Sequence, residues 1–263
     1  MKAMILAAGL GTRLRPLTED RPKALVTVGG RTLLEIALGR LREFGVSEVI
    51  VNTHYFADMV EDYLKENGNF GMRIEISRED LLLDTGGGLK KAAPFFLEGG
   101  GDEPFFLHNV DVLSNIDLGR MVRFHREREA LATLAVQERE SSRLLLFDPM
   151  GQLCGRRTRR GGETAVEMVR PVPDARALAF CGIHAISPRL LGKMTGEGAF
   201  SIIGAYLELA ARGERVVAFR ADECSWRDLG RPESIAQAEL DLAGGKHADQ
   251  RSEGPGALAN GDG

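Results

Sequence analysis

The chain has 263 residues, of which 43% are hydrophobic and 27% charged, and a formal net charge of −4. This length fits one large α/β domain or two small ones, and the slightly acidic balance argues against nucleic acid as the main partner. No apolar run approaches a membrane span, the N-terminus does not resemble a signal peptide, and three widely spaced cysteines favour a reducing, cytoplasmic location.

Strand and helix patterns alternate through the first half of the chain. Strands are predicted at 2–7, 48–52, 73–77 and 104–109, and helices near 32–44, 57–65 and 118–128, with a glycine loop at 84–88 and a short helix to residue 93. This alternation predicts an α/β protein with a Rossmann-like, doubly wound mixed sheet in a three-layer αβα arrangement. Ligands of such sheets bind beyond the carboxyl ends of the strands, so the loop at 9–23, the glycine loop and Asp111 are expected on one rim.

The second half changes character and predicts an antiparallel-rich portion that covers the same rim. Strands are predicted at 131–136, 144–147, 177–186 and 215–220, and helices at 201–211 and from 232 to about 242. We predict a single domain over residues 1–243, with a nucleotide-binding half at about 1–130 and a second-substrate half at 131–243. Residues 244–263 are rich in Gly, Asp and Ala and are predicted to form a disordered tail. The basic run at 156–160 is predicted to be a solvated hairpin tip.

The first predicted strand opens into a loop that carries Gly9 and Gly11, and the cations Arg13 and Lys23 follow. Glycines let the backbone approach a ligand and expose its N–H groups, and cations neutralise phosphates. The dinucleotide fingerprint fails here because Leu14 stands where its third glycine belongs, and the Gly-Lys-Ser/Thr of a P-loop is absent. The pattern predicts a different kind of nucleoside triphosphate site.

The ordered stretch from Leu6 to Thr18, Leu-Ala-Ala-Gly-x-Gly-Thr-Arg-x-x-Pro-Leu-Thr, with Pro22-Lys23 after it, closely resembles the signature of the sugar-1-phosphate nucleotidyltransferases. The resemblance covers about residues 1–242 and implies the nucleotide-diphospho-sugar transferase fold. It implies that an NTP and a sugar 1-phosphate give an NDP-sugar and pyrophosphate. It further implies nucleotide contacts from Leu6, Ala7, Ala8, Gly9, Gly11, Thr12, Arg13, Asp84, Thr85, Gly86 and Gly87. Arg13, Lys23 and Asp111 are the implied catalytic residues.

Two aspartates are candidate ligands for Mg²⁺, which prefers carboxylate and phosphate oxygens. Asp111 follows a buried strand, at the place where the family holds its metal, although Val110 replaces the family's usual glycine. Asp228 lies in Trp-Arg-Asp-Leu-Gly, which resembles the Trp-x-Asp-x-Gly element that supplies the second metal carboxylate. For the sugar phosphate the candidates are Arg143, Glu167 and Arg170, of which the last two match a Glu-Lys-Pro element only loosely.

Two other functions stay open. A cytidylyltransferase for phosphocholine or another small phosphate would use the same glycine loop, although one Trp and three Tyr offer little for a choline cage. A catalytically inactive nucleotide-binding regulator would have no need of both aspartates with Arg13 and Lys23. The sequence does not give the base or the sugar, and it shows no interface stripe for the homodimer that such folds often form.

Overall fold

The structure, a computed structural model, describes residues 1–243, so the predicted disordered tail at 244–263 lies outside the described residues. Its centre is a parallel sheet in the order β6-β1-β4-β5. These strands are β1 (Lys2–Leu6), β4 (Glu48–Thr53), β5 (Arg73–Arg78) and β6 (Phe105–Asn109). Their carboxyl ends therefore meet at one edge, where the sequence predicts the ligand rim.

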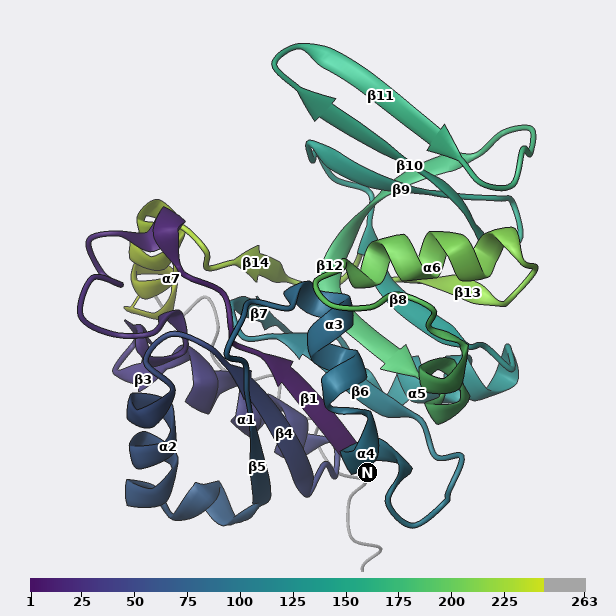
Figure 1. Cartoon of the computed structure of the whole chain (residues 1–263). Helices are drawn as coiled ribbons and strands as arrows, with labels where there is room; N and C mark the ends of the chain where they lie inside the picture. The colour runs from purple at the N-terminus through teal and green to yellow at the C-terminus, as the bar shows by residue number, and fades with distance from the viewer. Residues whose placement is uncertain (244–263) are drawn as a thin grey trace, which may run out of the picture.

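The second half of the chain extends this sheet with mostly antiparallel strands, the exception being β13, which runs parallel to β8 (Figure 1). The long strand β12 (Arg176–Ile186) runs antiparallel to β6 and also pairs with β8 and β9. The remaining strands are β8 (Ala132–Gln137), β9 (Arg143–Phe147), β10 (Leu153–Arg160), β11 (Glu163–Met168) and β13 (Val216–Arg220). Two small antiparallel pairs stand apart from this ten-stranded sheet: β2 (Thr27–Val28) with β3 (Arg31–Thr32), and β7 (Val112–Ser114) with β14 (Trp226–Asp228).

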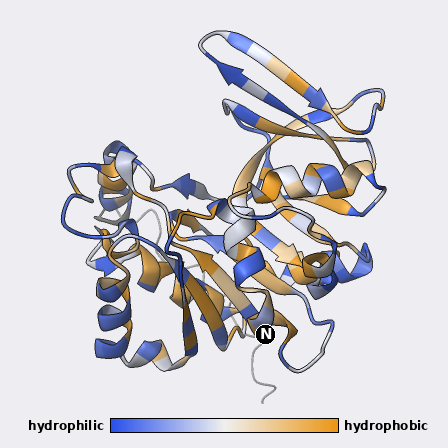
Figure 2. Ribbon diagram, viewed as in Figure 1, coloured by the Kyte–Doolittle hydropathy of each residue, from blue (hydrophilic) through white to orange (hydrophobic). Residues whose placement is uncertain are grey.

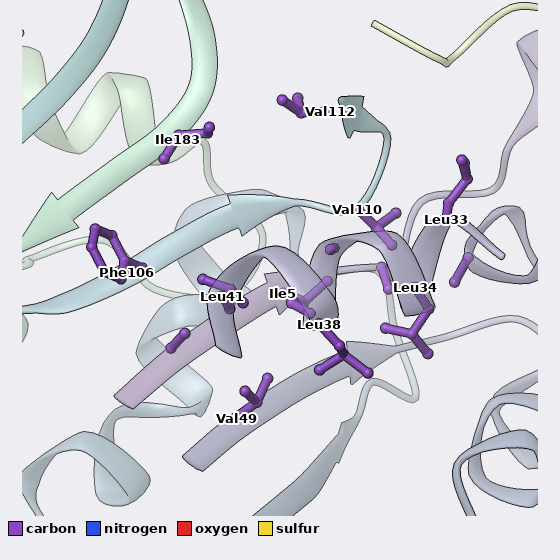
Figure 3. Packing of buried hydrophobic residues seen from close by; sticks show 14 of the residues in the cluster. Ile5, Leu33, Leu34, Leu38, Leu41, Val49, Phe106, Val110, Val112 and Ile183 are labelled. Atoms are coloured by element: carbon purple, nitrogen blue, oxygen red, sulfur yellow. The ribbon is translucent and has the colours of Figure 1, made fainter. Parts of the chain in front are cut away.

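Helices cover both faces of the sheet, and the strand residues alternate between two cores. Ala3 and Ile5 of β1 belong to one buried cluster and Met4 to the other, as the period of two in a strand requires. The first cluster receives α1 (Leu33–Glu43), α2 (Ala57–Glu66), α5 (Leu118–Glu127) and α7 (Pro232–Ala243), and the second α3 (Asp84–Lys91), α4 (Ala93–Leu97) and α6 (Ile202–Ala211). Figure 3 shows α1 lying over β1 and β4.

This arrangement confirms the predicted three-layer αβα fold with a doubly wound mixed sheet. Figure 2 shows mostly apolar colouring along the central strands and polar colouring at the arrowhead end of β10. Within residues 1–243, none of the helices combines the length and apolar character needed to cross a membrane.

The sequence predicts a hairpin tip for the basic run at 156–160. The structure places this run in the second half of β10 instead. Strand β9 lies on one side of it and β11 on the other, so its backbone forms ladder hydrogen bonds. The tip itself is formed by Gly161 and Gly162, where both residues have positive φ, 58° and 89°.

The glycine run at 86–88 is predicted as a loop, but it lies in the first turns of α3. The reason is tight packing against the segment that precedes α6. The Gly86 and Gly87 N–H groups both donate to the carbonyl oxygen of Phe200, at 2.8 and 3.3 Å. A Cβ on Gly86 would lie 2.5 Å from the Phe200 ring, so a larger residue does not fit there. Glycine is used here for close approach inside a helix and not for loop flexibility.

The burial of three histidines predicts that acid lowers the free energy of unfolding. Burial lowers the pKa of His108 and His125 to about 4 and that of His184 to about 3, from 6.5. The unfolded chain binds protons at these groups below pH 6.5, whereas the folded chain does so only near pH 4, so stability falls as the pH drops through this interval. The melting temperature should be lower at pH 5 than at pH 7.5. His125→Gln should reduce this difference by roughly a third, since one of three titrating groups is removed. Equal melting temperatures at both pH values would contradict this effect.

Candidate active site

The loop after β1 presents unoccupied backbone donors at the carboxyl edge of the sheet. Within residues 1–243, the N–H groups of Gly9, Leu10 and Gly11 have no hydrogen-bond acceptor. Gly11 has the left-handed φ of 65°, and Thr18 holds its carbonyl oxygen through a 2.8 Å hydrogen bond. Successive free N–H groups in such a turn form an anion-binding concavity. The predicted Leu6, Ala7, Ala8 and Thr12 flank these residues, as the last residue of β1, two buried alanines and the first residue of a 3₁₀ turn.

A buried hydrogen-bond chain that the sequence does not reveal ties this loop to the start of α3. Asn52 at the end of β4 accepts from the Ala7 N–H at 2.7 Å and donates to Glu79 Oε1 at 2.7 Å. Glu79 in turn accepts from the Leu83 N–H at 2.9 Å. Asn52 and Glu79 are both buried. Neither belongs to a glycine motif, so only their place at the ends of two predicted strands could have pointed to them.

The second predicted nucleotide segment, residues 84–87, begins α3 beside the hydrogen bonds of Asn52 and Glu79. Thr85 Oγ1 accepts from the Ile202 N–H at 3.0 Å, and Asp84 Oδ1 accepts from the Thr85 N–H at 2.6 Å. The Gly86 and Gly87 N–H groups are already engaged by the Phe200 carbonyl oxygen. Nucleotide binding by these four residues therefore stays a prediction, and it has to use atoms other than the two glycine N–H groups.

The two predicted metal aspartates lie side by side although 117 positions separate them in the sequence. Asp228 ends β14, whose register places it opposite Val112 of β7, directly after Asp111. The Leu229 N–H donates to the Asp111 carbonyl oxygen at 2.8 Å, which fixes the two turns together. A Cβ built on Gly230 would lie 2.7 Å from Asp228 Oδ1 and 3.1 Å from Asp111 Oδ2. Glycine at this position therefore allows the two carboxylates to converge.

The two predicted cations neutralise these carboxylates. Lys23 Nζ donates to Asp111 Oδ2, and Arg13 Nη1 lies 3.7 Å from Asp228 Oδ2. Burial by itself would raise the pKa of Asp111, but the charge and hydrogen bond of Lys23 outweigh it and hold the pKa below its usual value. Asp111 is therefore ionised at neutral pH and available as an oxygen ligand.

The residues fit a magnesium ion that phosphates help to bind. Within residues 1–243 there is no group of three or more His, Cys, Asp and Glu side chains that could hold a metal without other ligands. Mg²⁺ is usually bound by one or two carboxylates together with substrate phosphates. Asp111 and Asp228 can provide the carboxylates, and the free N–H groups beside them can hold the phosphates.

A cavity of about 580 Å³ opens beside these carboxylates. This volume suits a sugar phosphate, since ligand pockets range from about 300 to 1,000 Å³. Its lining joins Arg13, Asp111 and Asp228 to residues of the second half, among them Arg143, Arg139, Phe180, Ser201 and Trp226. Of these second-half residues the sequence predicts Arg143 and Asp228, whereas Arg139 and the aromatic residues carry no recognisable signal.

The other two predicted sugar-phosphate residues do not line this cavity. Glu167 lies on β11 and accepts a 2.6 Å hydrogen bond from Arg156. Arg170 pairs with Asp148 and with the Leu153 carbonyl oxygen, each at 3.5 Å. The physical reason is that Glu167 lies on the edge strand β11, one strand beyond the β10 residues that line the cavity, and that Arg170 follows β11.

Residues 2–144 match the model of the nucleotidyl transferase family. The chain belongs to this family. It is 37% identical over 246 residues to the N-acetylmuramate α-1-phosphate uridylyltransferase of Caulobacter vibrioides, a match that covers 92% of the chain and 96% of that protein. It is 38% identical over 137 residues to a probable mannose-1-phosphate guanylyltransferase of Oryza sativa, covering 52% of the chain and 38% of that longer protein.

Solved structures agree with the fold. A UDP-glucose pyrophosphorylase complexed with UDP-glucose superposes with a TM-score of 0.70 at 20% identity, covering 92% of the chain and 98% of that structure. The inositol-1-phosphate CTP transferase of T. maritima superposes with a TM-score of 0.72 at 17% identity, covering 94% of the chain and 96% of that structure. Family membership confirms that the chain is an enzyme that transfers a nucleotidyl group from an NTP to a sugar 1-phosphate.

Proposed function

We propose that this enzyme transfers the uridylyl group of UTP to N-acetylmuramate 1-phosphate, with Mg²⁺ as cofactor, in the cytoplasm. The observation that carries the choice of base and sugar is the match to the Caulobacter uridylyltransferase, which extends over 96% of that protein and so includes the acceptor half. In sequence, the rice guanylyltransferase matches the chain over only 52% of its length. The three cysteines are free, which agrees with a reducing compartment.

The proposed reaction needs positioning and charge neutralisation, because the attacking group is already an anion. A phosphate oxygen of the acceptor attacks the α-phosphorus of UTP, and pyrophosphate leaves on the opposite side. The N–H groups of residues 9–11 and the Arg13 guanidinium hold the triphosphate, and Lys23 stabilises charge on the α-phosphate. Asp111 and Asp228 would hold Mg²⁺, which supplies neutralisation of phosphate charge when bound.

In this proposal, the acceptor lies in the cavity between the two halves of the chain. Residues 1–130 supply the nucleotide side and residues 131–243 the sugar side. Arg143 is retained as an acceptor residue because it lines the cavity. Glu167 and Arg170 are not retained, since neither lines the cavity and each is engaged with a partner of opposite charge.

A matrix of four NTPs against several phosphate acceptors tests the proposal by pyrophosphate release. The highest kcat/KM is expected for UTP with N-acetylmuramate 1-phosphate. A higher value for GTP with mannose 1-phosphate would contradict the assigned base and sugar. Turnover of CTP with phosphocholine alone would establish the cytidylyltransferase alternative, and NTP binding without any turnover would establish the regulator.

A further inference from the structure

The side of the acceptor cavity that the second half of the chain forms carries an excess of positive charge. Arg139, Arg143, Arg156 and Arg157 line it, from the segment after β8 and from strands β9 and β10. Arg156 is neutralised by Glu167 through a 2.6 Å hydrogen bond. In the described part of the chain, neither Arg139 nor Arg143 forms an ion pair. Together with Arg157, which likewise has no ion pair among residues 1–243, these two arginines therefore face the space in which the acceptor is proposed to bind.

Arg139 is held rigidly in this position. Its guanidinium carbon lies 3.7 Å from the centre of the Trp226 ring, and its Nη2 donates to the Phe180 carbonyl oxygen at 2.8 Å. Its Nε is buried and has no hydrogen-bond partner. A partly buried cation with an unused donor is costly unless an anion approaches it. Among the described residues, Asp228 attracts the guanidinium but does not form an ion pair with it, so the arrangement leaves room for a ligand anion.

The spacing separates this anion from the reacting phosphates. Trp226 and Asp228 are alternate residues of β14 and both line the cavity. Two residues of a strand span about 7 Å, so the Trp226 position is displaced from the metal carboxylate by roughly the length of one sugar ring. Arg143 stands opposite Thr158 in the β9–β10 register, and both line the same cavity. An anionic substituent on the sugar could reach these two arginines while the phosphate remains at Asp111 and Asp228.

We propose that Arg139 and Arg143 bind a carboxylate on the sugar of the acceptor, and so select acidic sugar 1-phosphates over neutral ones. This inference rests on the proposed function, since N-acetylmuramate carries a carboxylate in its lactyl ether and N-acetylglucosamine does not. Planar guanidinium groups suit a carboxylate because they can donate two parallel hydrogen bonds. Both arginines are specificity-determining residues, and neither takes part in the phosphate chemistry.

The experiment compares kcat/KM for N-acetylmuramate 1-phosphate and N-acetylglucosamine 1-phosphate, with UTP, in matched variants. Arg139→Met keeps an apolar contact with Trp226, and Arg143→Gln changes an exposed side chain, so both should fold. We expect the preference for the acidic acceptor to fall about 100-fold in Arg139→Met and about 10-fold in Arg143→Gln, with the neutral acceptor nearly unaffected. Arg143→Lys should restore part of the preference. Arg123→Gln is the control, because Arg123 is an exposed cation of α5 that does not line the cavity.

An unchanged ratio of the two kcat/KM values in both variants would overturn the inference. Equal use of the two acceptors by the unmodified enzyme would also overturn it and would leave uridylyl transfer intact. If UTP reacts with neither acceptor, the proposed function fails instead. The variants are then measured with glucuronate 1-phosphate against glucose 1-phosphate and the NTP that reacts, and a ratio insensitive to both arginines rejects carboxylate selection.

Discussion

Asp111→Asn is expected to lower kcat for pyrophosphate release by about a thousandfold at saturating Mg²⁺. The change keeps the shape of the side chain but removes one of two converging carboxylates. It also leaves Lys23, whose side chain is 15% exposed, without its carboxylate partner, so some loss of melting temperature should accompany it. The measurement is pyrophosphate release against Mg²⁺ concentration, with a thermal melt in parallel.

Asp228→Asn separates catalysis from folding, because Asp228 is 43% exposed and its cation Arg13 is 55% exposed. Its kcat should fall by a similar factor with little change in melting temperature. The double variant should lose scarcely more than either single one, since the two carboxylates act as one site. Asp62→Asn on the outer helix α2 is a control that removes one carboxylate outside the cavity lining. Wild-type turnover and Mg²⁺ dependence in Asp228→Asn would reduce Asp228 to a turn residue.

Gly230→Ala is expected to lower kcat about 100-fold while the protein stays folded. The added Cβ would lie 2.7 Å from both Arg13 Nη2 and Asp228 Oδ1, and 3.1 Å from Asp111 Oδ2. Those atoms are the ends of side chains, so they can move aside at small cost in stability, but they then leave the positions that hold the reacting phosphates. Small displacements of catalytic groups have large effects on rate.

A glycine with free space around it provides the matched control. A Cβ added to Gly39 in α1 would meet no atom within 4 Å, so Gly39→Ala should keep full activity and raise helix stability by up to about 1 kcal/mol. The measurements are kcat and melting temperature for both variants. Unchanged kcat in Gly230→Ala would show that the convergence of Arg13 with the two aspartates is not needed for turnover.

The convergence of the candidate residues of the first half is predictable from the sequence, because they lie close together or at strand ends. Gly9, Gly11, Arg13 and Lys23 share one loop, and Asp111 follows a strand whose apolar run is unmistakable. The pairing of Asp228 with Asp111 rests on the family resemblance at the level of sequence, and the structure accounts for it by the β7–β14 register.

The residues proposed for the acceptor side are less predictable, because only tertiary contacts bring them to the cavity. Arg139 is one charged residue among many in the sequence, and only its stacking on Trp226, 87 positions later, aims it at the cavity. Glu167 and Arg170 match a family element loosely, and the projecting hairpin places them elsewhere. The glycines of α3 show the same limitation, since their contacts with Phe200 are invisible in a local pattern.

The most direct test of nucleotidyl transfer follows the two ends of UTP in a single turnover. The enzyme is incubated with Mg²⁺, N-acetylmuramate 1-phosphate and UTP labelled either at the α- or at the γ-phosphorus. We expect the α-label to appear in the sugar nucleotide and the γ-label in pyrophosphate, and only when the acceptor is present. Release of UMP or of inorganic phosphate, with no label in a sugar nucleotide, would contradict the proposed reaction.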